Sequence, residues 1–345
     1  MKTIQELLQY VVDNKASDLH VVVGAPPTVR LDGALVPVAG EAAVTPLSAG
    51  QLINGVLSAE QKEVLTVNRE LDFSFTLAEK ARFRVNAYQQ KGSMAAAFRL
   101  VPAVIPGIEE LGLPKICHQF AALKQGFILV TGPTGHGKST TLAAMLEEIN
   151  KTRPVHIVTI EDPVEYVYAS TKALVSQREI RQDTHSWEIA LRSVLREDPD
   201  VVLIGEMRDF ETIAAALTIA ETGHLVFATL HTNSAAQTVD RIVDVFPESQ
   251  QAQARLQLSA NLEAVLSQRL VPKTTGGRVV AYEIMLGSGA VKTAIREGRT
   301  HTLDNIITTS AEMGMVSLES NLEALVKAGT ITLEVAQAYG LRRGK

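Results

Sequence analysis

The sequence predicts an α/β protein with two domains, in which a smaller α+β domain precedes a larger domain built on a mostly parallel sheet. Three observations lead to this prediction. Short segments among the first hundred residues alternate apolar and polar residues, as half-buried antiparallel strands do. The later part holds continuous apolar runs between helical patterns, which is typical of strands covered on both faces. The 345 residues, 46% of them hydrophobic, suffice for two cores.

Composition excludes several classes of protein. The formal net charge is −5, so the sequence shows no overall basic excess of the kind that nucleic-acid binding favours, and we expect no nucleic-acid partner. Apolar runs stay shorter than the roughly eighteen residues that span a bilayer, so we expect no membrane insertion. Cys117 is the single cysteine, which excludes an internal disulfide and a cysteine-cluster zinc site and fits a reducing cytoplasm.

The first domain is expected to begin with a helix. Residues 1–20 place Ile4, Leu7, Leu8 and Val11 at helical spacing, which predicts an amphipathic helix rather than a signal peptide. The remaining elements expected here are strands at 19–23, 27–31, 71–77, 82–89 and 95–100, a turn at Asp32-Gly33, and two short helices within 46–68.

Proline and glycine residues then indicate a linker. We therefore expect an N-terminal domain at 1–100, a linker and hinge at 101–112, and a C-terminal domain at 113–345. The continuous apolar runs of that second domain predict buried strands at 127–131, 156–160, 201–204 and 225–229. Helices are expected at 141–150, 250–268, 290–297, 302–310, 317–328 and 333–338.

One segment carries the strongest chemical signal. Between the strand at 127–131 and the helix at 141–150 the chain matches Gly-x-x-x-x-Gly-Lys-Ser, the phosphate-binding loop. Its glycines let backbone N–H groups face a polyphosphate, Lys138 would reach the β- and γ-phosphates, and the Ser139 hydroxyl would ligate Mg²⁺. The sequence therefore predicts a nucleoside triphosphate and Mg²⁺ as ligands. The predicted binding residues are Gly132, Pro133, Thr134, Gly135, His136, Gly137, Lys138, Ser139 and Thr140.

Acidic residues follow two of the predicted strands. Glu206 comes just after the strand at 201–204, where a carboxylate would help Ser139 to hold Mg²⁺, partly through water. Glu161, Asp162 and Glu165 follow the strand at 156–160, and any of the three could polarise the attacking water. Carboxyl ends of parallel strands meet at one sheet edge, so both groups are expected beside the phosphate-binding loop.

Histidines flank the last predicted strand of the sheet. His231 lies just past its end and could donate a hydrogen bond to a γ-phosphate, whereas His224, before it, could equally be structural. In the first domain, Arg82, Arg84 and Arg99 lie on predicted strands. Such arginines are usually solvated, although in a ring assembly one could stabilise phosphoryl transfer in a neighbouring subunit.

Taken together and in this order, these segments resemble the secretion ATPase superfamily, and within it the type IV pilus retraction ATPase family. Further segments carry the same resemblance: Ala16-Ser-Asp-Leu-His20, Arg82-Phe-Arg-Val-Asn86 and the run from Gly276 to Met285. The resemblance implies a RecA-like P-loop ATPase domain behind a PAS-like N-terminal domain. It also implies a cytoplasmic homohexamer that hydrolyses ATP to drive pilus retraction and twitching motility. Such a motor acts on a membrane platform protein at the cytoplasmic face of the inner membrane.

The resemblance also assigns roles to single residues. It makes Glu165 the catalytic glutamate and Glu206 the Mg²⁺-associated acid, and it implies that Arg82, Arg84 and Arg99 reach the nucleotide, partly across a subunit boundary. Two segments depart from the family pattern. His136 stands where the family usually has serine, and its side chain is expected to point away from phosphate. The run from Ala290 to Glu297 matches the family's retraction motif at its ends but differs in the middle.

Alternatives remain at the level of function. An accessory retraction paralogue is hard to separate from the retraction motor by sequence. An extension or type II secretion ATPase would be expected to carry a tetracysteine zinc motif, which one cysteine excludes, and a larger N-terminal region. A RecA-like nucleic-acid translocase would instead require a basic channel.

Overall fold

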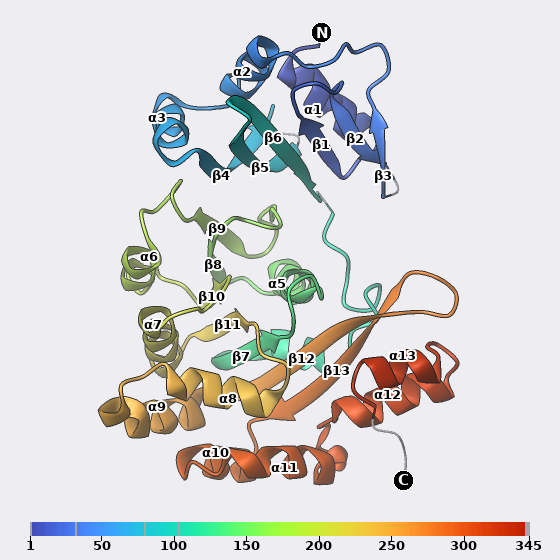
Figure 1. The fold of residues 1–345 in the computed structure, drawn as a ribbon. Helices are drawn as coiled ribbons and strands as arrows, with labels where there is room; N and C mark the ends of the chain where they lie inside the picture. Colours follow the sequence, from blue (N-terminus) through green and yellow to red (C-terminus); the bar gives the residue numbers. More distant parts are fainter. Residues whose placement is uncertain (1, 32, 79–80, 103, 342–345) are drawn as a thin grey trace. The chain divides into compact units, whose positions relative to one another are not determined.

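The computed structural model describes residues 2–31, 33–78, 81–102 and 104–341. They form two compact units, Met1–Val104 and Ile105–Lys345 (Figure 1). Asp32 of the expected turn, residue 103 of the expected hinge and residues 342–345 of the expected second domain lie outside the described residues.

The first unit is an antiparallel sheet with helices packed on it. Its six strands run in the order β3-β2-β1-β6-β5-β4, and its core contains Leu7, Leu19, Phe83 and Phe98. The elements are α1 (Ile4–Asp13), β1 (Asp18–Val21), β2 (Thr28–Leu31), β3 (Ala34–Pro37), α2 (Pro46–Asn54), α3 (Ala59–Asn68), β4 (Glu70–Leu77), β5 (Ala81–Gln90) and β6 (Ser93–Val101). The two helices and the strands expected at 71–77, 82–89 and 95–100 are confirmed.

The N-terminal helix is shorter than the sequence predicts. The capping box of Thr3 and Glu6 starts α1, and the helix ends at Asp13 instead of continuing to residue 20. Lys15 takes a left-handed conformation with φ of 53°, and Asp18 already belongs to β1. Pairing of β1 with both β2 and β6 outweighs the helical pattern there. Strand β3 was missed because its four residues are all exposed and show no alternation.

The second unit contains a seven-stranded sheet in the order β13-β12-β7-β11-β10-β8-β9. All neighbouring strands are parallel except β12 and β13. The strands are β7 (Gly126–Thr131), β8 (His156–Glu161), β9 (Leu174–Glu179), β10 (Val201–Ile204), β11 (Leu225–Leu230), β12 (Leu262–Pro272) and β13 (Arg278–Leu286). The four buried strands that the sequence predicts are confirmed as β7, β8, β10 and β11.

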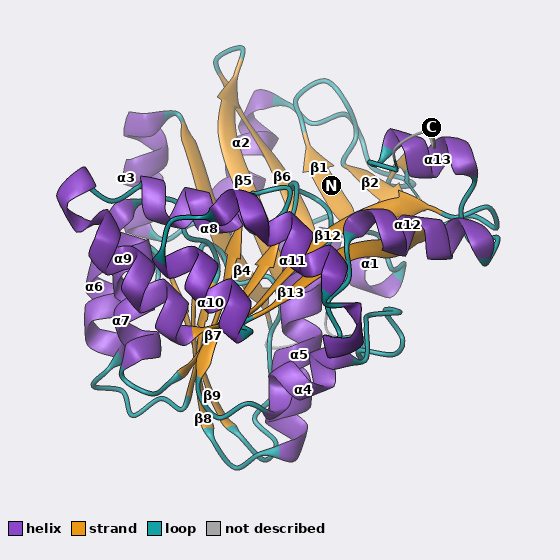
Figure 2. Cartoon of the chain, turned by 90° about the horizontal axis from the view of Figure 1, so that it is seen from below, coloured by secondary structure: helices purple, strands orange, loops and turns teal. Residues whose placement is uncertain are grey.

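Helices cover both faces of this sheet. One face packs against α4 (Ile116–Ala122) and α5 (Lys138–Thr152). The other packs against α6 (Trp187–Val194), α7 (Phe210–Glu221), α8 (Ala235–Asp244), α9 (Glu248–Asn261), α10 (Gly289–Arg296) and α11 (Leu303–Thr309), several of which lie in front of the strands in Figure 2. Short 3-10 turns at Thr300–Thr302 and Ala311–Met313 flank α11, and α12 (Leu318–Lys327) and α13 (Leu333–Ala338) pack around Val271 and Ala281.

The expected helix at 250–268 is wrong in its second half. Helix α9 ends at Asn261, and β12 begins at Leu262. The residues that follow include good helix formers, yet they are buried between β7 and β13, and this pairing decides their conformation. The edge strand β9 was also missed, because polar residues such as Ser176 and Gln177 interrupt its apolar pattern.

The segment after β6 belongs partly to the second unit. Ile108 is only 2% exposed and packs in the same core cluster as Phe120 of α4. His118 of α4 pairs through Nε2 with Glu109 at 2.7 Å and through Nδ1 with Glu148 of α5 at 2.7 Å. These contacts hold residues 105–112, which the sequence predicts as part of the hinge, against α4 and α5. The hinge itself stays a prediction.

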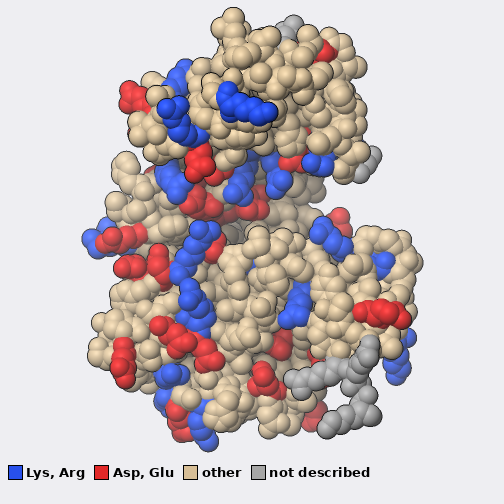
Figure 3. Space-filling model, in the orientation of Figure 1, with Lys and Arg blue, Asp and Glu red and all other residues tan. Residues whose placement is uncertain are grey.

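Charged side chains of both signs lie on the surface (Figure 3). On the face drawn in Figure 3, basic and acidic side chains are interspersed rather than gathered by sign. Within the described ranges, every helix falls short of the length or the apolar character that crossing a membrane requires.

The His118 contacts predict a pH dependence of stability. The Glu148 carboxylate, with help from Glu109, raises the pKa of His118 above its usual 6.5 against the opposing effect of burial. Because the folded state binds this proton more tightly, protonated His118 contributes its full stabilisation below pH 6.5. The stabilisation is lost as pH rises through the pKa of His118 in the folded state. His118→Gln should therefore lose stability relative to wild type at pH 6 and approach it at pH 9, as measured by urea unfolding.

The control for this measurement is His185→Gln, which makes the same change at an exposed histidine. Equal pH dependence of unfolding in wild type and His118→Gln would contradict the assignment.

Candidate nucleotide-binding site

The loop between β7 and α5 has a backbone that requires glycine at its start and favours glycine at its end. Gly132 has φ of 138°, and a Cβ there would lie 2.2 Å from the backbone oxygen of Gln268. Gly137 has φ of 83° and precedes the first turn of α5, which has no side-chain cap. The first N–H groups of an uncapped helix are available to an acceptor, and the helix dipole favours an anion. These features fit a phosphate group.

Lys138 lies at the centre of this loop. Its side chain is buried, and its ammonium group donates to the backbone oxygens of Gly132 at 2.9 Å and Pro133 at 3.1 Å. The third neighbour of the nitrogen is His231 Nδ1 at 3.2 Å. Burial lowers the pKa of Lys138, while the Glu206 and Glu165 carboxylates act in the opposite direction. The loop thus holds the Lys138 ammonium group where it could bind a phosphate group.

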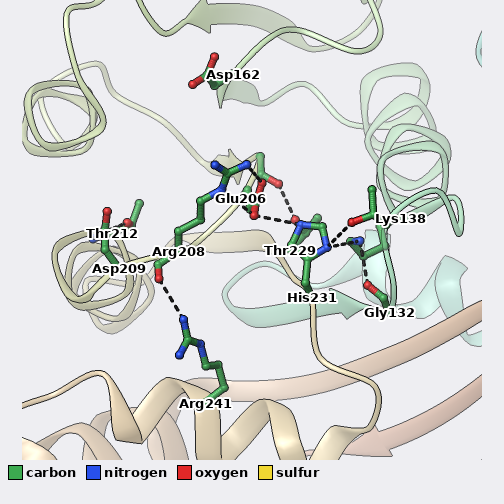
Figure 4. A network of polar contacts seen from close by, with 12 residues as sticks. Gly132, Lys138, Asp162, Glu206, Arg208, Asp209, Thr212, Thr229, His231 and Arg241 are labelled. Carbon is green, nitrogen blue, oxygen red and sulfur yellow. Dashed lines mark hydrogen bonds and ion pairs between the residues drawn. The ribbon is translucent and has the colours of Figure 1, made fainter.

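Figure 4 shows His231 between Lys138 and Glu206. Its Nδ1 also lies 3.2 Å from Thr134 Oγ1, and its Nε2 lies 2.9 Å from Glu206 Oε1. An ammonium group only donates hydrogen bonds, so Nδ1 accepts from Lys138 and the proton sits on Nε2, which donates to Glu206. The chain of contacts links the ends of β7, β11 and β10.

Glu206 is further held by Arg208. The guanidinium places Nε 2.8 Å from Oε1 and Nη2 2.8 Å from Oε2, a bidentate pair. Burial alone would raise the pKa of Glu206, but Arg208, His231 and Lys138 lower it below the usual value. Glu206 is therefore an anion at neutral pH. Sequence reasoning missed Arg208, although its place two residues after the acid was a usable signal.

The acidic residues after β8 occupy different environments. Glu161 is buried and accepts hydrogen bonds from Thr159 Oγ1 at 2.7 Å and from the Glu165 backbone N–H at 3.3 Å. Burial raises its pKa to about 7 despite these bonds. Asp162 and Glu165 are exposed, and Asp162 lies 3.8 Å from Arg181. Glu161 therefore organises the loop, whereas Glu165 is accessible to a ligand.

A further contact joins this acidic loop to the phosphate-binding loop, because the hydroxyls of Tyr166 and Thr140 lie 2.9 Å apart. Ser139 follows Lys138 in the first turn of α5, and Glu206 lies just past the end of β10. A hydroxyl, a carboxylate and several waters are a donor set that suits Mg²⁺. These residues could therefore hold that ion beside a phosphate.

His224 is separated from the rest of the site. It precedes β11, whereas His231 follows that strand, so the two histidines lie at opposite ends of it. The Nδ1 atom of His224 lies 3.0 Å from the Ile219 backbone oxygen and 3.0 Å from Thr222 Oγ1, at the end of α7. Of the two possibilities that the sequence leaves open, this geometry supports the structural one.

The three candidate arginines lie in the first unit. Arg82 and Arg84 alternate with the buried Phe83 along β5, and Arg84 pairs in register with Arg99 of β6, so all three share the face opposite the core. Arg99 Nε donates to Asp18 Oδ1 at 2.9 Å. Burial would raise the pKa of Asp18, but Ser17 and Arg99 lower it. Their contact with a nucleotide remains a prediction.

Comparison with known proteins places this geometry in a family. The family model described as type II/IV secretion system protein matches residues 1–338. The chain belongs to this family.

Similar members of the family support the same placement. The type IV pilus retraction ATPase PilT of Pseudomonas aeruginosa is 48% identical over 97% of this chain and 97% of its own. A twitching motility protein of Neisseria gonorrhoeae is 50% identical over 84% of this chain and 77% of its own. A crystal structure of the pilus retraction motor PilT with bound ADP covers 99% of this chain and 97% of its own, with a TM-score of 0.91 and 45% identity. The expected α/β, RecA-like class is confirmed, whereas the PAS-like character of the first unit stays a prediction.

The buried Glu161 predicts a second pH effect. Its carboxyl pKa rises from the usual 4.5 to about 7, so ionisation opposes folding. The free energy of unfolding is therefore highest below pH 4.5, where Glu161 is neutral in both states. It falls as pH rises toward 7, by about 3 kcal/mol at most. Glu161→Gln, which cannot ionise, should therefore gain stability relative to wild type between pH 5 and 8 in urea unfolding.

Asp162→Asn is the matched control, since it makes the same chemical change at the exposed neighbour. If Glu161→Gln and wild type keep a constant difference in unfolding free energy across this range, the burial argument is wrong.

Proposed function

We propose that this protein is a hexameric motor ATPase that hydrolyses ATP with Mg²⁺ to power type IV pilus retraction and twitching motility. One observation carries the proposal. The phosphate-binding loop, His231 and Glu206 meet at one sheet edge in a chain that is similar to PilT along almost its whole length. Conversion of ATP and water to ADP and phosphate is the reaction that this arrangement suits.

Each group of residues in the site has a separate role in this reaction. Lys138 and the N–H groups of Gly132–Thr140 bind the phosphates, and Ser139 and Glu206 hold Mg²⁺, Glu206 partly through water. When bound there, Mg²⁺ would supply positive charge against the phosphate oxygens. Glu165 accepts a proton from the attacking water. His231 donates through Nε2 to Glu206, and redirecting this N–H to a γ-phosphate oxygen would report that the phosphate is present.

The assembly follows from the same proposal. Six copies form a ring, in which Arg82, Arg84 or Arg99 of one subunit reaches the nucleotide of its neighbour. The segment 101–112 acts as the hinge between the two units, and its Glu109 pairs with His118 of α4. The ring works in the cytoplasm on a membrane platform protein at the cytoplasmic face of the inner membrane, without entering the membrane.

An accessory retraction paralogue is the second candidate. The observation in its favour is that α10 carries the retraction motif only toward its ends, from Ala290 to Glu297. A translocase of nucleic acid receives no comparable support, since the net charge is −5.

Catalysis by Glu165 can be tested by Glu165→Gln. This variant should bind ATP within about twofold of wild type but hydrolyse it at least about a hundredfold more slowly, because the general base is lost. Phosphate release and binding of a fluorescent ATP analogue measure the two effects.

Lys138→Ala is the contrasting variant, since it should lose nucleotide affinity itself through the missing ammonium group. Hydrolysis by Glu165→Gln at the wild-type rate would remove Glu165 from its assigned role.

The direction of the motor can be tested in cells. Deleting the gene should give cells with excess surface pili and no twitching, because pili are extended but not withdrawn. Wild-type protein should restore twitching, and Glu165→Gln protein should not. Bald cells would indicate an extension ATPase, and cells that still twitch would indicate an accessory role.

A further inference from the structure

Strand β12 continues past the end of its neighbour β7. The last register pair of these two strands joins Ser267 to Thr131, where β7 gives way to the phosphate-binding loop. On its other side β12 stays paired with β13 as far as Pro272. Residues 268–272 therefore have a strand on one side and the loop on the other.

His136 occupies the place that a further strand residue would take. The backbone N–H of Leu270 donates to His136 Nδ1 at 2.9 Å. The side-chain Nε2 of Gln268 donates to the backbone oxygen of His136 at 2.8 Å. Buried backbone N–H groups need acceptors, and here a side chain of the loop supplies one.

The loop also lies close to β12 at the glycines on either side of His136. A Cβ at Gly132 would collide with the Gln268 backbone oxygen, and a Cβ at Gly137 would lie 3.4 Å from the Gln268 amide and 3.5 Å from Leu270 Cδ1. The loop therefore packs along β12 at both ends and is held by His136 in between.

We propose that His136 is a positioning residue, whose imidazole holds the phosphate-binding loop against β12 so that the loop keeps its binding shape before a nucleotide arrives. The proposal rests on the proposed binding of nucleotide at this loop. It concerns the side chain of His136, whereas the backbone of the same residue belongs to the loop that meets the phosphates. Preorganisation of this kind raises affinity because less order must be imposed on binding.

The contact requires a neutral imidazole. Nδ1 accepts only when it carries no proton. Protonation would turn Nδ1 into a donor facing the Leu270 N–H donor, so the hydrogen bond would break and the loop would be released from β12. Three charged groups face the ring: Arg269 of β12, Lys138 of α5 and Arg278 of β13. Burial and these cations lower the pKa of His136 below its usual 6.5. The contact therefore persists at neutral pH and is lost in acid, as pH falls through the lowered value.

The experiment compares full-length wild type, His136→Ala and His136→Asn by titration with a fluorescent ADP analogue at pH 7.5. His136→Ala should bind about fivefold more weakly, the effect of one neutral hydrogen bond. His136→Asn should regain most of the affinity, because its Oδ1 can accept from Leu270. Thermal unfolding without nucleotide checks that each variant is folded.

The pH profile separates positioning from a merely structural role. Between pH 7.5 and 5.5 wild type should lose affinity relative to His136→Asn, which keeps its acceptor in acid. His301→Asn removes an exposed histidine of the 3-10 turn after α10 and should keep the wild-type profile. The other titrating groups are common to all these proteins, so they cancel in the comparison.

Three results would overturn the proposal: wild-type affinity in His136→Ala, affinity in His136→Asn as low as in His136→Ala, or the same acid loss in His136→Asn as in wild type. If His136→Ala does not fold, the profiles of wild type and His136→Asn still decide. Failure of wild type to bind ADP at all would refute the proposed function instead.

Discussion

The parallel register of four strands is the constraint on which the site depends. Strands β7, β11, β10 and β8 pair side by side, with Val130 opposite Thr229 and Ile204 opposite both Ala228 and Ile160. Their carboxyl ends therefore reach the same edge of the sheet, and the residues that follow them converge. A hydrogen bond from Thr229 Oγ1 to the Gly205 backbone oxygen at 2.6 Å ties the turn after β10 to β11. A shift of one residue between β7 and β11, or between β11 and β10, would separate Lys138, His231 and Glu206.

Around this edge the charges are already paired. The buried Lys138 ammonium is costly to desolvate, and the carbonyl oxygens of the loop together with His231 compensate it. Glu206 is balanced in turn by His231 and Arg208. Nucleotide binding at such a site would replace some protein contacts of Lys138 and Glu206 by contacts with the ligand. Neither charge would be left buried without a partner. This is a physical reason why a phosphate group can alter the contacts of His231 and, through it, those of Glu206.

Much of this could be predicted from the sequence, since the signals are local. Continuous apolar runs identified the central strands, and the glycine spacing identified the loop. Other features depend on distant partners. Glu161 differs from Glu165 because the fold buries it and brings Gln177 of β9, 16 residues away, to its carboxylate. The contact between His136 and Leu270 joins residues 134 positions apart, so the sequence indicated only that the side chain points away from phosphate.

The sequence by itself determined the class of the sheet and predicted a phosphate-binding loop, because strand burial and glycine spacing can be recognised in short runs of residues. Only the tertiary structure decided that residues 262–272 form a strand and not the end of a helix, because the burial that settles their conformation comes from β7 and β13. It likewise decided the direction in which the pKa values of His136, Glu161 and Glu206 shift, since a pKa depends on neighbours that the fold brings from other elements.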